Sequence, residues 1–486
     1  MTSVRFKGFV GNSYLLRNSS YDCQRLVNMY VLPDESQLGR NGEIAQLVRT
    51  PGLTQLVPSN DQPGKCVYKA SDGNLYYATN IALYKIIGNI TSTWSSTFIG
   101  WITLPGPVQI SDNGTYLFIV SAGVGYSYNM STGVIAPITG VNPNSTTYFD
   151  GYVVFSNYQT NKFYWTDLYS TSVNGLNFAS AEANADKIVG LINNNEDLWI
   201  FGEKTTELWY DAGTGNVVFQ RRPGILIETG CAAANTVQKI TTNRLMWLAV
   251  DDRSSPYVVM AIGYTVTKVS TFAQDQAWAN LTAEQIAGAT AYTYMQDGSM
   301  FYVLNIPGTA STWVFDVTTS DLIQAHTWHE RATYSDDNIE SRHWAESHVY
   351  HQGKHVVCDY RNGAIYFYDV DGYTDNGTLI RRVRVSPHLS NSGTRMFYDS
   401  LTIDFKVGVG NSNTPDPQIM LEYSNDGGKT WSNQLFKSVG NQGSFSSRVI
   451  FRQLGLARDR VFKLTLTDPV DWAISGASLD LRAGSS

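Results

Sequence analysis

Histidines are the residues of this sequence whose clustering most strongly suggests chemistry. Six of the seven fall within one short stretch, namely His326, His329, His343, His348, His351 and His355. Imidazole binds transition metals and changes charge near neutral pH. On strands, however, His326 and His329 point to opposite faces, and His351 and His355 share a face but lie roughly 13 Å apart. A metal site and a protonation-sensitive interface therefore remain alternatives, and we expect ordinary structural positions.

The segment Ser424-Asn-Asp-Gly-Gly-Lys-Thr-Trp431 fits the Asp box pattern of sialidases and other propeller proteins. Ser424, Asp426, Gly428, Thr430 and Trp431 stand at the expected positions. Asp426 can accept backbone N–H groups within the turn, the glycines permit positive φ, and Trp431 can pack beneath the hairpin. A sialidase would also need several boxes, an arginine cluster and a Tyr/Glu nucleophile pair. We therefore predict a structural turn.

Two other loops carry weaker signals. Asp369-Val-Asp-Gly-Tyr-Thr-Asp375 supplies oxygen ligands suited to calcium but lacks the sixth-position Gly and the terminal Glu of an EF-hand. Gly428-Lys-Thr430 is similar to the end of a phosphate-binding loop, but the required earlier Gly is missing. GxSxG, HExxH and GxGxxG motifs are absent from the sequence. We predict no catalytic residue, no metal and no cofactor, and hence a protein that is not an enzyme.

A basic cluster consists of Arg381, Arg382 and Arg384. The arginines are interleaved with Val383 and Val385, a pattern typical of a strand with one solvated or subunit-facing side. Nucleic-acid contact is one interpretation, but a subunit interface is favoured.

Composition favours β-structure and a reducing compartment. Charged residues make up 16% of the chain, aromatic residues 13%, and there are 41 glycines, which suit pleated surfaces and turns. The net charge of −7 argues against tight binding of phosphate backbones. The widely spaced cysteines, Cys23, Cys66, Cys231 and Cys358, contain no CxxC pair, which predicts reduced thiols and assembly in a cytoplasm. The sequence contains no run of about 18 apolar residues, so we expect neither export nor membrane insertion.

From about Cys66 to Val385 the sequence repeats a hairpin unit of strand, polar turn with Gly, and aromatic strand. Val108-Gln-Ile-Ser-Asp-Asn-Gly-Thr-Tyr-Leu-Phe-Ile119 is one example. We count about seven such units at intervals of roughly 40 to 60 residues, the range of propeller blades. The predicted fold is all-β, a β-propeller of six or seven blades with an additional antiparallel β-sandwich-like domain. An irregular stack of sandwiches is the alternative.

Changes in this spacing predict three regions. Residues 1–60 lack the repeat and contain Pro33, Pro51 and Pro58, so they are predicted to be an extended arm that docks on the platform. Residues 61–385 form the propeller, and 386–486 the sandwich-like platform domain. Ala residues between Phe272 and Ile286 predict a short helix.

Several segments of the chain resemble the packaged-DNA stabilisation proteins, or tail hubs, of podoviruses, which are short-tailed bacteriophages. They share order and spacing with that family and are Arg25-Leu-Val-Asn-Met-Tyr-Val, Arg49-Thr-Pro-Gly-Leu, Leu198-Trp-Ile-Phe-Gly-Glu-Lys-Thr-Thr-Glu-Leu-Trp-Tyr, Ile227-Glu-Thr-Gly-Cys, Met246-Trp-Leu-Ala-Val-Asp, Asp359-Tyr-Arg-Asn-Gly-Ala-Ile-Tyr and Gln453-Leu-Gly-Leu-Ala-Arg-Asp-Arg-Val-Phe.

This resemblance implies a structural virion protein assembled in the host cytoplasm. It would be a tail hub or nozzle in which six copies extend the channel of the portal and adaptor rings and retain packaged DNA. Its implied partners are itself as a homohexamer, the head-to-tail adaptor, and spike or fibre and needle proteins. DNA would pass without sequence-specific binding.

Two alternatives follow from individual residues. A receptor-binding propeller could recognise a host glycan through exposed aromatics such as Trp165 or Trp209. A sialidase-like hydrolase, suggested by the single Asp box, ranks last.

Overall fold

Tight polar turns join the strands of repeated antiparallel hairpins over most of the chain. In the hairpin of β7 (Gly64–Lys69) and β8 (Leu75–Thr79), the Asp72 side chain accepts hydrogen bonds from Asn74, and Gly73 has φ +81°. Glycine adopts this left-handed conformation without a steric penalty. The computed structural model describes residues 2–34, 44–89, 93–184, 186–214, 217–335 and 337–484.

Five separate sheets of four antiparallel strands follow one another along the chain. The first three are β7–β8 with β9 (Ala82–Ile87) and β10 (Ser95–Trp101); β11 (Gln109–Asp112), β12 (Tyr116–Ser121), β13 (Val124–Asn129) and β14 (Ile135–Pro137); and β15 (Pro143–Phe149), β16 (Tyr152–Asn157), β17 (Lys162–Thr166) and β18 (Val173–Ser180). The next two are β19 (Ile188–Asn194), β20 (Asp197–Gly202), β21 (Thr206–Thr214) and β22 (Val217–Ile227); and β23 (Gln238–Thr241), β24 (Arg244–Val250), β25 (Pro256–Ile262) and β26 (Thr265–Lys268).

Two more four-stranded units belong to larger sheets. They are β27 (Thr290–Gln296), β28 (Ser299–Asn305), β29 (Thr312–Asp316) and β30 (Trp328–Tyr334); and β32 (Ala345–His351), β33 (Lys354–Asp359), β34 (Ile365–Asp369) and β6 (Gly52–Val57). The short β31 (Glu340–Arg342) extends the former unit, and β35 (Thr374–Asp375) with β36 (Thr378–Leu379) extends the latter. Within the described residues these units make seven propeller blades, which we number in chain order.

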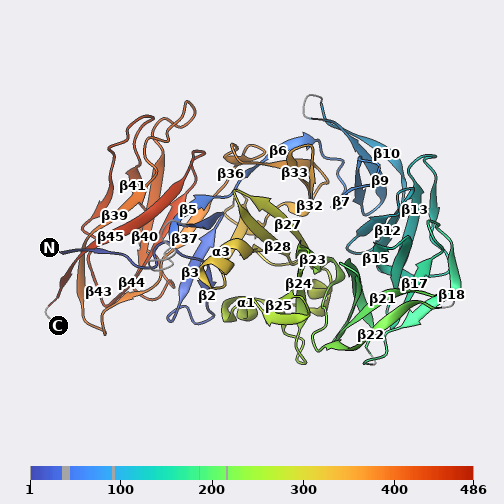
Figure 1. Cartoon of the computed structure of the whole chain (residues 1–486). Helices are drawn as coiled ribbons and strands as arrows, with labels where there is room; N and C mark the ends of the chain where they lie inside the picture. Colours follow the sequence, from blue (N-terminus) through green and yellow to red (C-terminus); the bar gives the residue numbers. More distant parts are fainter. Residues whose placement is uncertain are drawn as a thin grey trace.

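The ring closes because β6, which precedes the first blade, is the outer strand of the last blade. β6 pairs antiparallel with β34, and the last blade's innermost strand, β32, packs against β7 of the first. Figure 1 shows the blades following one another around the right-hand part of the molecule, from blue through green and yellow to orange. The predicted boundary at residue 60 therefore leaves one blade strand in the N-terminal region.

Apolar side chains between neighbouring blades form the propeller core. β20 is buried along its whole length, and its Trp199 packs against Trp247 of the next blade with ring centroids 6.4 Å apart. A blade covered on both faces needs apolar residues at successive positions, which explains why apolar and polar residues do not alternate along β20.

Two antiparallel sheets form the C-terminal sandwich. One contains β4 (Met29–Pro33), β5 (Ile44–Arg49), β45 (Ala473–Ala483), β39 (Met396–Phe405) and β42 (Val449–Arg452), with β1 (Thr2–Arg5) on β45 and β43 (Leu456–Ala457) on β39. The other contains β3 (Cys23–Val27), β37 (Arg382–Val385), β44 (Asp459–Leu466), β40 (Gln418–Ser424) and β41 (Leu435–Ser438), with β2 (Tyr14–Leu15) on β3 and β38 (Leu389–Ser390) on β44. The core between them includes Leu26, Leu401, Phe462 and Trp472.

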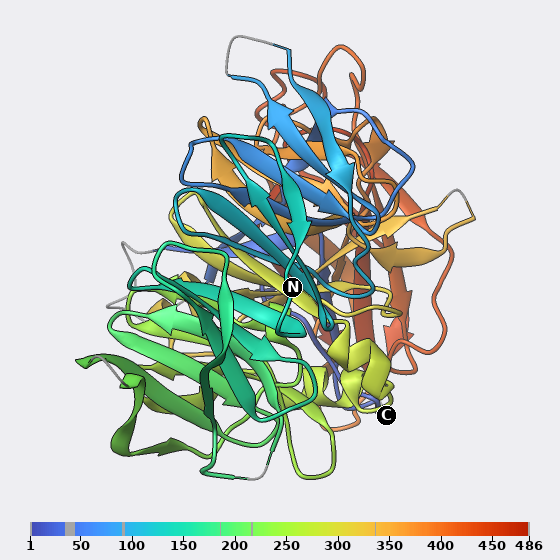
Figure 2. The same ribbon diagram turned by 90° about the vertical axis from the view of Figure 1, so that its right-hand side faces the viewer.

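The second sandwich sheet is continuous with propeller blade six. β3 pairs in parallel with β30 through Val27 and Glu330, and pairs antiparallel with β37 on its other side. The N-terminal segment thus contributes strands to both domains, and both chain ends lie at the sandwich (Figure 1). Figure 2 shows the propeller in front and the orange and red strands of the sandwich behind it.

Short helices lie in connections between blades and, for one of them, within blade six. α1 (Phe272–Trp278) and α2 (Ala283–Ala287) begin with capping boxes at Thr271 and Thr282, so the predicted helix is two helices. α3 (Val317–Ile323) begins at the N-cap Asp316, and the 3-10 turn η2 (Ala234–Thr236) precedes β23. The predicted fold class, an all-β propeller with a C-terminal sandwich, is confirmed.

Candidate functional site

The innermost strands surround an axial cavity of about 240 Å³. Each blade contributes to its wall, through Tyr68, Gln109, Thr146, Leu191, Gln238, Ala291 and Ser347 among others. Polar wall groups bind one another across blades: Gln109 Oε1 accepts hydrogen bonds from Ser145 Oγ at 2.6 Å and from the Thr146 backbone N–H at 3.1 Å. These bonds stiffen the ring. The cavity is much too small for duplex DNA, whose major groove alone is about 12 Å wide.

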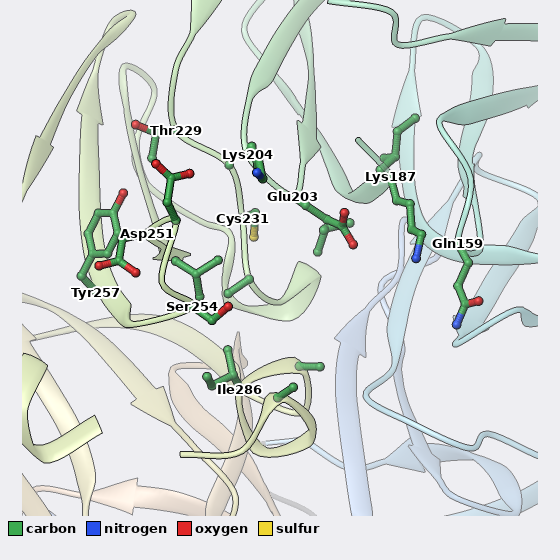
Figure 3. A pocket seen from close by; sticks show the side chains of 18 of the residues that line it. Gln159, Lys187, Glu203, Lys204, Thr229, Cys231, Asp251, Ser254, Tyr257 and Ile286 are labelled. Atoms are coloured by element: carbon green, nitrogen blue, oxygen red, sulfur yellow. The ribbon is translucent and has the colours of Figure 1, made fainter. Parts of the chain in front are cut away.

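A larger pocket of about 720 Å³ lies where the third, fourth and fifth blades meet α2. Figure 3 shows Lys187 and Gln159 on one side, Asp251 and Tyr257 on the other, and Ile286 below. The rim carries exposed charges of both signs over a partly apolar floor.

Cys231 lines this pocket, and its thiol is unreactive. Its side chain is 1% exposed, and burial raises the pKa of the thiol to about 12. The Sγ atom donates to the Ala233 carbonyl at 3.2 Å. A neutral thiol held in this way is a poor nucleophile. Cys231 therefore offers the pocket no reactive thiolate.

The Asp box forms a self-contained turn after β40. Asp426 Oδ1 accepts from Ser424 Oγ at 2.6 Å and from the Lys429 and Thr430 backbone N–H groups at 3.0 Å each. The Thr430 hydroxyl donates to Asp426 Oδ2 at 2.6 Å, and Gly428 has φ +83°. Hydrogen bonds from the Ser424 and Thr430 side chains hold the pKa of Asp426 well below its usual range. These partners lie within the turn itself.

Two of the three clustered arginines are buried inside the chain. Arg384 donates to the carbonyls of Phe9, Asn12 and Gly8 at 2.7 to 2.9 Å, which fixes the N-terminal segment on β37. Arg382 is also fully buried, and burial lowers the pKa of Arg382 to about 10 and that of Arg384 to about 9.

Arg382 and Arg384 cannot reach a second subunit without unfolding, so the predicted interface role must be withdrawn for both. The alternation of Arg and Val predicted one solvated face, but β37 lies between two other strands and is covered on both faces. Arg381 is partly exposed, lies over the Tyr334 ring at 4.5 Å and donates to Asn338. Its interface role stays a prediction.

The histidines are scattered except for one pair. His329 and His343 are buried, and burial lowers their pKa values well below the usual range. The pair is His348 with His355, whose Nε2 and Nδ1 atoms are 2.9 Å apart. Within the described part of the chain, no group of three or more His, Cys, Asp or Glu residues is placed to hold a metal ion.

The candidate glycan-binding tryptophans and the last carboxylate of the candidate calcium loop are buried inside the protein. Trp165 and Trp209 are each 8% exposed and pack around Phe163 and Phe219, so they cannot offer a glycan platform. Asp375 is buried, and among the described residues the carboxylates of its loop form no group that could hold a metal ion. No helix in the described ranges is long and apolar enough to cross a membrane.

Sequence reasoning missed an ionic cluster at the junction of propeller and sandwich. Arg25 of β3 binds Glu330 of β30 at 2.5 Å and Glu340 of β31 at 2.6 Å. Ser13 and Ser311 donate to the Glu330 carboxylate at 2.7 and 2.9 Å. Burial opposes the charged form, but the two carboxylates outweigh it and raise the pKa of Arg25. More than 300 residues separate the partners, so no local pattern reveals the cluster.

The chain is thus a closed propeller bound through a shared sheet to a sandwich. The family described as bacteriophage P22 Gp10 matches both parts, its beta-propeller over residues 9–372 and its beta-sandwich over residues 381–482. The chain belongs to this phage DNA-stabilisation family. It is a structural virion protein that retains DNA and is not an enzyme, as the sequence predicted.

Solved structures with similar folds are remote in sequence. The extracellular domain of a B. thetaiotaomicron two-component system has 11% identity and a TM-score of 0.43, over 76% of this chain and 45% of that one. Virginiamycin B lyase from Staphylococcus aureus has 10% identity and a TM-score of 0.41, over 65% of this chain and 98% of that one. The N-terminal domain of Nup159 has 11% identity and a TM-score of 0.39, over 66% and 94%.

The chain spans less than half the length of the first of these structures. Likeness at this level carries no functional argument. No curated protein was found to match the sequence.

Proposed function

We propose that this protein is the tail hub of a short-tailed phage, in which six copies form a ring below the portal and adaptor. In this role it extends the channel, holds the packaged genome and anchors spike or fibre and needle proteins. The observation that carries the proposal is membership of the P22 Gp10 family through both domains. The ring lies in the tail of the virion.

The geometry supports a passage between subunits. The axial cavity of about 240 Å³ excludes duplex DNA from the propeller itself, so the channel runs along the centre of the ring of copies. A rigid subunit suits this task because retaining DNA under pressure requires stiffness and no chemistry. The continuous sheet from β27 to β41 provides such stiffness between the two domains.

The charge of −7 agrees with a conduit. Each Lys or Arg contact to a phosphate adds affinity and salt dependence, and a strongly basic lumen would retard ejection. Contact with DNA is accordingly weak and independent of base sequence.

The test is assembly on the natural template. The purified chain is mixed with connectors carrying the adaptor, and the mass of the product is measured beside negative-stain images. We expect six added copies in a ring, and particles lacking the protein should lose their DNA. A chain that stays monomeric on the connector, with DNA retained in its absence, would contradict the proposal.

A further inference from the structure

Charged side chains are scarce in the outer part of the first three blades. Residues 86–180 contain four of them, namely Asp112, Asp150, Lys162 and Asp167. The outer strands β10, β14 and β18 contain none, whereas the outer strand of blade four, β22, carries Arg221 and Arg222, and that of blade five, β26, ends at Lys268. Because charged side chains usually protect edge strands from association, the first three blades differ from their neighbours.

Apolar side chains project to solvent from these uncharged strands. Trp101 of β10 is 71% exposed, and its ring centroid lies 4.9 Å from that of Phe98, which is also exposed. Leu176 of β18 is 83% exposed, and Val134, just before β14, is exposed as well. Burying such groups against a partner is favourable because it removes apolar surface from water.

The three outer strands adjoin one another. A Cβ added at Gly100 of β10 would lie 2.9 Å from Ile135 Cδ1 of β14. One added at Gly140, which follows β14, would lie 3.4 Å from the Val173 carbonyl oxygen of β18. The strands therefore form one surface, which we call the outer face. Depletion of charge together with exposed aromatic rings is the composition of the centre of a protein interface.

The sandwich carries a second surface of the same composition, which we call the sandwich face. It consists of β41 with the loops 407–415 and 439–447, and Lys437 is its one charged residue. Phe436 and Phe445 are 58% and 76% exposed. Figure 1 shows β41 at the left-hand end of the molecule and β10, β13 and β18 at the right-hand end. The two faces thus lie at opposite ends of one chain.

This arrangement fits a head-to-tail contact between copies of the chain. A two-fold dimer uses one surface that binds itself, whereas a ring needs two different surfaces, each covered by the next copy. The outer face has no cation on its strands to bind phosphate and no charge to select a charged partner. An uncharged, aromatic surface is its chemical match, and the sandwich face supplies one.

We propose that the outer face of one copy binds the sandwich face of the next copy. The inference rests on the proposed function, because it names the contact by which the copies of the tail hub form their ring.

The test is made on rings assembled on connectors that carry the adaptor. The photoreactive amino acid p-benzoylphenylalanine replaces Trp101 or, as a control, Phe272, an aromatic residue of α1 that is 72% exposed and lies outside both faces. After irradiation, mass spectrometry identifies the linked peptides. We expect links from the Trp101 position to residues 407–415 or 435–447, and none from the Phe272 position. Such a link joins two copies, because the faces lie at opposite ends of one chain.

Assembly at graded protein concentrations measures the same contact. Trp101→Lys and Phe436→Lys should each raise the concentration needed for half-maximal assembly by about tenfold or more, because the contact would bury an unpaired charge. Phe272→Lys should assemble like wild type. All three side chains are exposed, so the variants should fold, and circular dichroism verifies this.

The outcomes separate this contact from the proposed function. A wild-type ring in which the Trp101 position links only to the adaptor, to a spike or fibre protein, or to nothing would overturn the contact and leave the hub intact. Assembly of both folded lysine variants at the wild-type concentration would do the same. Wild-type protein that forms no ring would contradict the hub, and the contact with it.

Discussion

At the scale of single residues, buried charge is the main feature that a linear pattern could not reveal. Arg384 and Arg381 are neighbours in one basic cluster, yet the first is 1% exposed and the second lies at the surface. Only contact with solvent separates their roles, so the two arginines form a matched pair for mutagenesis.

Arg384→Met should destabilise the protein strongly. It would leave the carbonyls of Phe9, Asn12 and Gly8 without their donor, and a buried unsatisfied group costs about 1 to 3 kcal/mol. We expect a loss of roughly 3 kcal/mol or more in urea unfolding, with faster amide exchange over residues 8–12. Arg381→Met should cost less than about 0.5 kcal/mol and reduce ring assembly instead. Equal destabilisation by both variants would contradict this division of roles.

The buried carboxyl group of Asp375 should make the stability of the folded protein depend on pH. Burial raises the pKa of this carboxyl to about 7, although the Arg382 charge opposes the shift. A folded-state pKa above the unfolded value near 3.9 means that the contribution to stability is fully present below about pH 4 and is lost as pH rises through about 7.

Asp375→Asn removes this dependence. The variant should therefore be more stable than wild type at pH 8, by up to roughly 4 kcal/mol, and the advantage should shrink at pH 5. Thermal melts at both pH values measure it, with the exposed Asp252→Asn as control. A variant that is less stable than wild type at pH 8 would contradict the predicted direction of the effect.

At the scale of elements, the closing strand β6 matters more than its six residues suggest. Its pairing with β34 joins the end of the propeller to its beginning. Leu53 of β6 is 1% exposed and packs with Tyr366 and Tyr368. The strand closes the ring without a covalent bond, through side-chain packing and backbone hydrogen bonds to β34.

Leu53→Ala should lower the free energy of unfolding by about 2 to 5 kcal/mol, as for other buried leucines. Hydrogen exchange should rise first in β34 and β32, because the last blade loses its outer strand. Leu176→Ala on β18 is the control, since Leu176 is 83% exposed and its loss should change stability by less than about 0.5 kcal/mol. Exchange that rises uniformly over all blades would argue against local opening at the seam.

At the scale of the whole molecule, propeller and sandwich share a sheet and should behave as one body. β3 lies between β30 and β37, and Arg25 binds Glu330 and Glu340 beside it. Most pairs of domains touch through separate surfaces and move relative to each other. Here relative motion would break backbone hydrogen bonds as well as an ionic cluster.

Calorimetry should therefore show one cooperative unfolding transition for wild type. Arg25→Met leaves the Glu330 and Glu340 carboxylates facing each other without a cation, a loss of about 3 to 5 kcal/mol for a buried pair, and should split the transition into two. Lys437→Met on the exposed edge strand β41 leaves the junction intact and should keep a single transition. Two well-separated transitions in wild type would contradict the single body.

The amino-acid sequence by itself determined the class of fold. Hairpin turns rich in Gly and Asp, with aromatic strands between them, are local signals, because two to four residues decide a turn. The Asp box is of the same kind, and its hydrogen bonds lie within eight residues of sequence. Family membership also followed from short segments in a shared order.

The tertiary structure alone decided burial, pairing and closure. Alternation in Arg381 to Val385 predicted a solvated face, but β3 and β44 flank that strand and both faces are covered. Spacing along the sequence placed His351 and His355 on one face but roughly 13 Å apart, whereas strand register places His348 beside His355. Contacts such as that of Arg25 with Glu330 link residues hundreds of positions apart. They form only once the propeller has closed, and no local sequence pattern encodes that closure.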